Sequence, residues 1–134
     1  MVSPNVMVVS HTLDVQQAFA SLLAKSDIVP IIASTGSEAK AILKHHSISL
    51  IFCSDDLPGS DVEDLIRQKS PEPNRVPTVV VSRLDQWDCF IRFLHMGALD
   101  YVLFPLSDVE IERVVKNALS LIELRKVRQA AAAN

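Results

Sequence analysis

Five short apolar runs recur along the chain at similar intervals. They lie at residues 6–9, 28–33, 50–53, 78–81 and 101–104. The runs are continuously apolar and do not alternate with polar residues, which is typical of parallel strands that are covered on both faces. The pattern therefore predicts five buried β-strands.

Helical patterns fill the segments after these runs. In the first segment Val15, Phe19 and Leu22 recur at helical spacing, so one apolar stripe is expected to face the sheet. Ser37 is predicted to cap the second helix. The other four stripes are Ala39, Ile42 and Leu43; Val62, Leu65 and Ile66; Trp87, Phe90, Ile91 and Leu94; and Ile111, Val114, Val115, Ala118, Leu119 and Ile122.

Strands and helices thus alternate five times, which predicts an α/β fold. Right-handed crossovers between parallel strands bury helical stripes on both faces, so we expect a three-layer sandwich. One domain is expected over residues 1–124, with a helical extension or linker over residues 125–134, where good helix formers dominate. Ligands of open parallel sheets bind beyond the carboxyl ends of the strands, so chemistry is sought there.

Composition narrows the functional classes. The chain is 49% hydrophobic and 22% charged with a net charge of −3, which favours a folded domain without the basic surface that nucleic acid or anionic lipid requires. No apolar run is long enough to span a membrane and no secretory pattern opens the chain, so a cytoplasmic location is expected. Cys53 and Cys89 lack metal-ligand spacing and are predicted to be buried thiols, and no metal or cofactor is expected.

Three segments carry a family resemblance. They are residues 50–61 (LIFCSDDLPGSD), 77–82 (PTVVVS) and 97–106 (GALDYVLFPL). Together they resemble a CheY-like response-regulator receiver domain, over residues 5–124, which is nearly the whole chain. The resemblance implies a flavodoxin-like (βα)5 fold with a five-stranded parallel sheet of order 2-1-3-4-5. It also implies a non-enzymatic role in two-component, or phosphorelay, signal transduction.

The residues on which the family's phosphorylation depends are replaced. The resemblance implies an acceptor aspartate where this chain has Ser54, an acidic pair where it has Ser10 and His11, and a lysine where it has Phe104. Mg²⁺ prefers carboxylate oxygens, and a phosphoryl group in transfer needs its charge neutralised. We therefore expect an atypical receiver that holds no metal and is not phosphorylated on aspartate.

Two residues of the family's conformational apparatus remain. Ser82 matches the hydroxyl position at the end of the fourth strand, and Tyr101 matches the aromatic switch position. Asp55 follows Ser54 directly and belongs to the same expected pocket. Because side chains alternate along a strand, the Asp55 carboxylate should point away from Ser54's side, so we do not expect it to replace the acceptor.

A small enzyme or a ligand-binding flavodoxin-like domain is the second interpretation. It would use Ser54, His11 and Ser82, because a hydroxyl beside an imidazole is the start of nucleophilic catalysis. No nucleophile-elbow motif surrounds Ser54, and the sequence offers no acid to orient His11. The pattern therefore favours protein contact over catalysis.

The fourth predicted helix carries more apolar width than one buried stripe requires. We expect Phe90, Phe93 and Met96, with Leu121 and Leu124 of the last helix, to form a partner surface. The partner would be a histidine kinase, a regulator or an effector domain. A second copy pairing through the fourth helix, fifth strand and fifth helix is the alternative. A stand-alone protein and a part of a longer regulator both fit the sequence.

Overall fold

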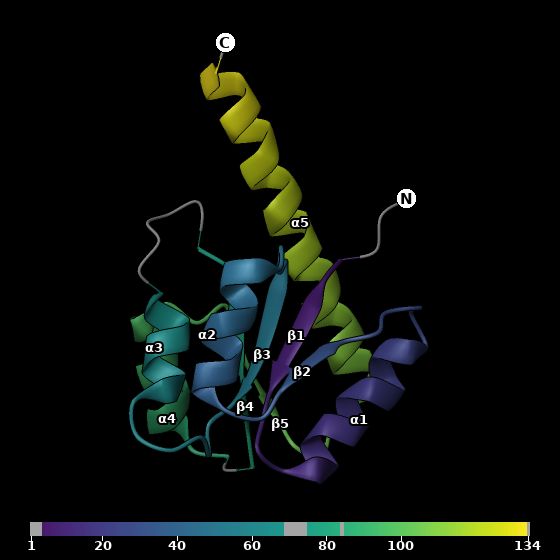
Figure 1. Ribbon diagram of the computed structural model, residues 1–134, viewed down its shortest axis with the longest axis vertical. Coiled ribbons are helices and arrows are strands. Elements are labelled where there is room, and N and C mark those ends of the chain that lie inside the picture. Colours follow the sequence, from purple (N-terminus) through teal and green to yellow (C-terminus); the bar gives the residue numbers. More distant parts are fainter. Residues whose placement is uncertain (1–3, 69–74, 84, 134) are drawn as a thin grey trace.

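Parallel strands alternate with helices in the computed structural model, which describes residues 4–68, 75–83 and 85–133 (Figure 1). The strands are β1 (Val6–Val9), β2 (Ile31–Ala33), β3 (Leu50–Ser54), β4 (Thr78–Ser82) and β5 (Asp100–Leu103). The helices are α1 (Leu13–Ala24), α2 (Gly36–His45), α3 (Asp61–Arg67), α4 (Trp87–Met96) and α5 (Asp108–Ala133).

The strands form one sheet in the order β2-β1-β3-β4-β5, and all neighbouring strands run parallel. The predicted fold class and strand order are therefore confirmed. The chain reverses its direction of travel across the sheet between β1 and β3. Ligand sites of open α/β sheets lie at this kind of switch point, beyond the carboxyl ends of the strands.

The sheet separates two apolar cores. On one face α1 and α5 cover the strands, and the rings of Phe19 and Phe52 lie 4.6 Å apart between their centroids. On the other face α2, α3 and α4 cover them, with Ile51, Leu65 and Phe93 among the buried side chains. Since every strand residue of β1, β3 and β4 is buried, the continuous apolar runs of the sequence have their physical explanation.

The start of α2 differs from the prediction that Ser37 caps it. Thr35 is the N-cap residue, and its side chain accepts a hydrogen bond from the Glu38 N–H at 3.1 Å. The Glu38 carboxylate in turn accepts from the Ser34 N–H at 2.9 Å. The helix begins at Gly36, so Thr35, three positions before Glu38, has the hydroxyl that caps it. Ser37 lies inside the helix.

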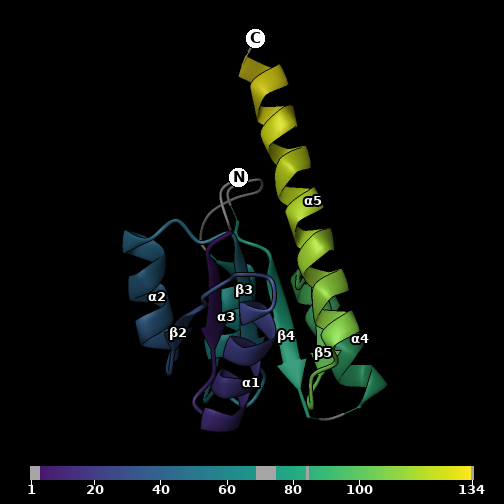
Figure 2. The same ribbon diagram turned by 90° about the vertical axis from the view of Figure 1, so that its right-hand side faces the viewer.

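α5 is longer than the part of it that packs on the sheet. Ile111, Val114, Val115 and Ala118 are buried, and the described residues after Ala118 are half-buried or exposed. Figure 2 shows the C-terminal half of α5 projecting beyond the end of the sheet at which β1 begins. Among the helices of the described ranges, none combines the length and apolarity that a membrane span needs.

Candidate functional site

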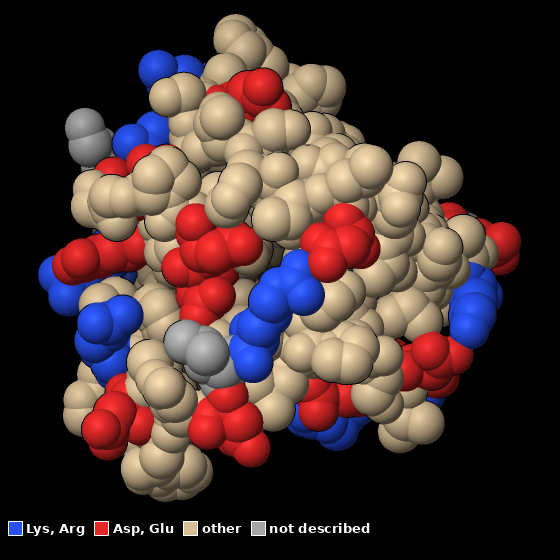
Figure 3. Space-filling view, turned by 90° about the horizontal axis from the view of Figure 1, so that it is seen from below, with Lys and Arg blue, Asp and Glu red and all other residues tan. Residues whose placement is uncertain are grey.

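The strands finish at the end of the molecule seen in Figure 3, where acidic and basic side chains surround a hollow. The hollow has a volume of about 220 Å³. Its lining residues are Val15, Ser54, Asp55, Asp56, Val81, Ser82, Arg83 and Phe104. The structure thus brings together Ser54, Asp55, Ser82 and Phe104 from the predicted set, whereas Ser10 and His11 lie outside the lining.

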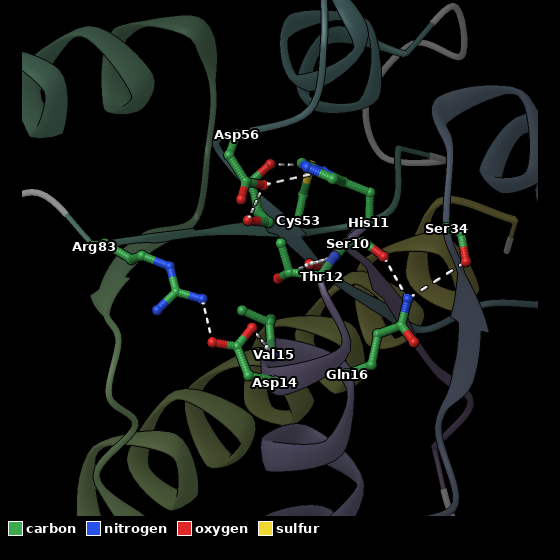
Figure 4. Close-up of polar contacts among 11 residues, drawn as sticks. Ser10, His11, Thr12, Asp14, Val15, Gln16, Ser34, Cys53, Asp56 and Arg83 are labelled. Carbon is green, nitrogen blue, oxygen red and sulfur yellow. Dashed lines mark hydrogen bonds and ion pairs between the residues drawn. The ribbon is translucent and has the colours of Figure 1, made fainter.

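Ser54 ends β3 and is buried. Its hydroxyl donates to Oδ1 of Asp56 at 2.5 Å. The same carboxylate oxygen lies 3.6 Å from Nδ1 of His11, as Figure 4 shows. Asp56 therefore stands between the serine and the histidine, and the Ser54 proton points to a carboxylate and not to the imidazole.

This geometry does not support the catalytic interpretation. A nucleophilic serine needs a base within hydrogen-bond reach of its hydroxyl, with an acid behind that base. Here the acid Asp56 lies between Ser54 and His11, so the order of the groups is unsuited to removing the serine proton. Ser82, the third residue of that interpretation, forms hydrogen bonds with Asp55 and Tyr101.

Ser10 is fully buried and its polar atoms are used within the loop that leads into α1. Its hydroxyl oxygen lies 3.1 Å from that of Thr12 and accepts from the Thr12 N–H at 3.2 Å. The Ser10 carbonyl accepts from the Gln16 side chain at 2.6 Å (Figure 4). These contacts make Ser10 a residue that shapes the loop before α1.

Asp55 corrects the expectation that its side chain points away from the pocket. It lies one residue beyond the end of β3, in a turn, where the alternation of strand side chains no longer applies. Its N–H donates to the Val81 carbonyl at 2.9 Å, and its carboxylate forms a hydrogen bond with the Ser82 side chain. The acid next to Ser54 is consequently a lining residue of the hollow.

Partial burial raises the pKa of the Asp55 carboxyl above the usual aspartate value. The hydrogen bond with Ser82 and the charge of Arg92 oppose this rise, and the neighbouring charge of Asp56 adds to it. Ser82 also forms a hydrogen bond with Tyr101, whose pKa burial raises as well. Asp55, Ser82 and Tyr101 thus form a connected polar chain from the hollow to β5.

The cation beside the hollow is Arg83, which follows β4. Its guanidinium carbon lies 4.4 Å from the centre of the Phe104 ring, within the range of a cation–π contact. Its Nη2 donates to Asp14 at 2.6 Å (Figure 4), and this hydrogen bond holds the pKa of Asp14 below its usual range. Phe104 therefore supports a cation that is already paired with a carboxylate.

The residues present do not fit the Mg²⁺ ion that the resemblance implies. Mg²⁺ needs several oxygen ligands in near-octahedral geometry. Ser10 is used by its own loop, His11 offers an imidazole nitrogen, and Asp55 is engaged with Ser82. Over the described ranges no group of three or more His, Cys, Asp or Glu residues is placed to hold a metal ion.

The structure also corrects the expectation that Phe93 belongs to an exposed surface. Phe93 is 5% exposed and its ring stacks on that of Tyr101, with centroids 6.1 Å apart. It lies on the side of α4 that faces the sheet, and Phe90 and Met96 pack partly against the same core. A stripe of apolar residues on a helix does not by itself reveal which member faces the sheet.

The exposed aromatic residue of α4 is Trp87, at 72% exposure. Its ring stacks on Phe90 with centroids 5.3 Å apart, and the Phe90 ring meets the edge of Tyr101 at 5.5 Å. On α5, Leu121 is half-buried and Leu124 is 48% exposed. A continuous series of ring contacts therefore leads from Tyr101 to the surface of α4.

The site includes three residues that the sequence did not reveal: Asp14, Asp56 and Arg83. Arg83 directly follows Ser82, so the rule that parallel strands end at the same edge could have included it. Asp56, two residues after the end of β3, fits the same rule, whereas Asp14 carried no such signal. Their roles depend on the turns after β1 and β3, which bring Asp14 to Arg83 and Asp56 to Ser54 and His11.

Comparison with known proteins identifies the family. The family described as "Response regulator receiver domain" matches residues 6–116. The chain belongs to this family. Receiver domains are signalling domains of two-component systems that contact kinases and effector domains, and the family is not one of enzymes.

Individual receiver proteins are similar at low identity. A putative NtrX-like response regulator from Rickettsia bellii is 22% identical over 91% of this chain, which spans 26% of that protein. The two-component response regulator ORR12 from Oryza sativa is 27% identical over 86% of this chain and 98% of its own. A response regulator from Thermotoga maritima has a TM-score of 0.79 at 28% identity, covering 89% of this chain and 99% of that one. The receiver fold is therefore found both in short regulators and within longer ones.

Proposed function

We propose that this receiver domain acts through protein contact and is not switched by phosphorylation of an aspartate at the end of β3. The Ser54 hydroxyl carries the proposal, because it stands where the family has its acceptor and donates to Asp56 at 2.5 Å. The replacements at three further positions support the same proposal, because phosphoryl transfer needs the metal-binding acids and the cation together. These positions are Ser10, His11 and Phe104. The hollow is then the remnant of a phosphorylation pocket.

The proposed partner surface is the exposed side of α4 with the adjoining β5 and α5. Trp87 offers a large exposed ring there, and aromatic residues dominate the energetics of protein interfaces. Phe90 and Met96 of α4, with Leu121 and Leu124 of α5, border it. A histidine kinase, a regulator or an effector domain, or a second copy of the chain, is the proposed partner.

The proposal extends to the setting of the domain. Residues 1–124 would be the receiver unit and residues 125–134 its helical extension. The net charge of −3 supports a protein partner over direct contact with nucleic acid. A cytoplasmic location, without membrane contact, is inferred from family membership.

Incubation with Mg²⁺ and acetyl phosphate tests the proposal. We expect no acid-labile, hydroxylamine-sensitive adduct by intact-protein mass spectrometry, because the acceptor position holds a hydroxyl and the cation that lines the hollow, Arg83, is already paired with Asp14. A conventional receiver that keeps the acceptor aspartate should gain about one phosphoryl group under the same conditions.

The variant Asp55→Asn makes the experiment decisive. Asp55 is the carboxylate nearest in sequence to Ser54 that lines the hollow. An adduct on the wild-type chain that disappears in Asp55→Asn would show that Asp55 has taken over the acceptor role, and the proposal would be abandoned. Absence of an adduct on both proteins supports it.

A further inference from the structure

The main apolar stripe of α5 changes sides along the helix. In the packed half, Ile111 and Ala118 face the sheet, and the opposite side carries Arg113, Lys116 and Ser120, with Val109 exposed in the first turn. In the projecting half, Leu124 is 48% and Val127 63% exposed, and Ala131 is also exposed. At 3.6 residues per turn these three lie on the side of α5 opposite to Ile111 and Ala118.

The side of the projecting half that continues the core-facing stripe is polar. Arg125 and Gln129 lie there, and Arg125 donates to the Arg75 carbonyl at 2.7 Å. Beyond Ile122, which is half-buried beside Leu119 and Leu22, the body of the domain therefore makes no apolar contact on this side of the helix. A helical segment without tertiary packing is marginal in water unless another element covers its apolar side.

The spacing and the charges fit a second helix of the same kind. Leu124, Val127 and Ala131 are separated by three and four residues, which is the a-d-a spacing of a two-stranded coiled coil. In that register Glu123 takes a g position and Arg128 the following e position. These positions face each other across a parallel pair, so the partner helix would meet opposite charge on both flanks.

We propose that the projecting half of α5 pairs with the same segment of a second copy of this chain, as a short parallel coiled coil centred on Leu124 and Val127. The two copies are related by a two-fold axis along the helices. Since the seam lies on the side of α5 away from the sheet, the two domain bodies extend in opposite directions. Leu124 also borders the partner surface on α4, but Val127 and Ala131 lie beyond that surface, and the proposal does not depend on the fate of the hollow.

Sedimentation equilibrium of the whole chain over a wide range of concentrations tests the pairing. We expect reversible dimerisation that Leu124→Asp weakens by at least about tenfold, because a charge would enter the desolvated seam. Gln129→Asp adds the same charge at an exposed position on the other side of the helix and should leave dimerisation unchanged. A monomer at all concentrations, or equal effects of the two variants, would overturn the proposal.

The flanking charges and the direction of pairing have their own tests. Glu123→Arg and Arg128→Glu should each weaken the dimer, and the double variant should restore it, although Glu123 also pairs with Lys126 at 3.7 Å within the helix. Leu124→Cys in a Cys89→Ser background should form an intermolecular disulfide on mild oxidation. Residues at an a position face their own copies in a parallel pair, so failure to form that disulfide rejects the parallel arrangement.

Discussion

At the scale of single residues, Asp55 holds a carboxylate in an unfavourable place. It is partly buried beside the carboxylate of Asp56, and the hydrogen bond from Ser82 only partly offsets the rise in pKa that these two causes produce. The ionised form is therefore the form that the folded state disfavours. Such a residue contributes more to a site than to the stability of the fold.

We expect Asp55→Asn to stabilise the domain at neutral pH. The cost of the ionised carboxylate is absent below the usual aspartate pKa, where Asp55 is protonated in both the folded and unfolded states, and is fully present above its raised pKa. Urea unfolding should thus give a higher midpoint for the variant at pH 7, and the two proteins should converge as the solution is acidified.

The matched control is Asp85→Asn, which removes an exposed carboxylate. Its unfolding free energy should stay within about 0.5 kcal/mol of wild type at pH 7 and after acidification. If Asp55→Asn were destabilising at pH 7, the hydrogen bond with Ser82 would outweigh the burial of the charge, and our account of this residue would be incorrect.

The sequence identified most of the residues in the site but not their contacts. Ser54, Ser82 and Phe104 lie at ends of strands, and their gathering follows from parallel pairing alone. The direction of the Asp55 side chain depends on where β3 stops, and the role of Asp56 depends on the turn that follows. Local patterns do not fix the end of a strand to within one residue, and here one residue decides whether the Asp55 side chain faces the hollow.

At the scale of elements, the cap of α2 offers a clean comparison. Thr35→Ala removes the hydroxyl that accepts from Glu38 N–H and should cost about 1 kcal/mol of unfolding free energy. Ser37→Ala, inside the same helix, should change it by less than about 0.5 kcal/mol. Urea denaturation of both variants measures this, and a larger loss from Ser37→Ala would contradict the observed cap.

Substitutions of a buried and an exposed aromatic residue of α4 should differ in their effect on stability. Phe93→Ala removes a buried ring that stacks on Tyr101 and should cost about 3–5 kcal/mol. Trp87→Ala removes an exposed ring that stacks on Phe90 and should cost about 1 kcal/mol or less. Thermal unfolding gives the ranking, and equal losses would mean that Trp87 belongs to the core.

The elements themselves were predictable because their burial is simple. Strands covered on both faces produce continuous apolar runs, and the first and last helices each bury one stripe. α4 was harder, since Trp87, Phe90 and Phe93 are equally apolar in sequence and differ only in how far each lies from β5. The expected second strand was also too long, because Val29 is 88% exposed and the strand begins at Ile31.

At the scale of the whole molecule, five alternating strand–helix units are compatible with few arrangements, and the family resemblance selected one of them.

Metal binding can be tested through the stability of the whole molecule. Any ion that binds the native state raises its melting temperature by mass action. Because the donor set does not fit Mg²⁺, we expect millimolar Mg²⁺ to leave the thermal unfolding midpoint unchanged, measured by calorimetry against an equal ionic strength of NaCl.

The opposite result would be informative in a definite way. A rise in melting temperature that Mg²⁺ produces and NaCl does not would indicate a site, and its loss in Asp55→Asn would place that site in the hollow. Our interpretation of the lining residues would then be incorrect.

The hydrogen bonds of Ser82 have a direction. Its hydroxyl has one proton, and an ionised Asp55 can only accept, so Ser82 is the donor in its hydrogen bond with that carboxylate. The charge state of Asp55 therefore determines which way the Ser82 hydroxyl turns beside Tyr101. Protonating Asp55 would allow that hydroxyl to turn, with no atom of the backbone displaced.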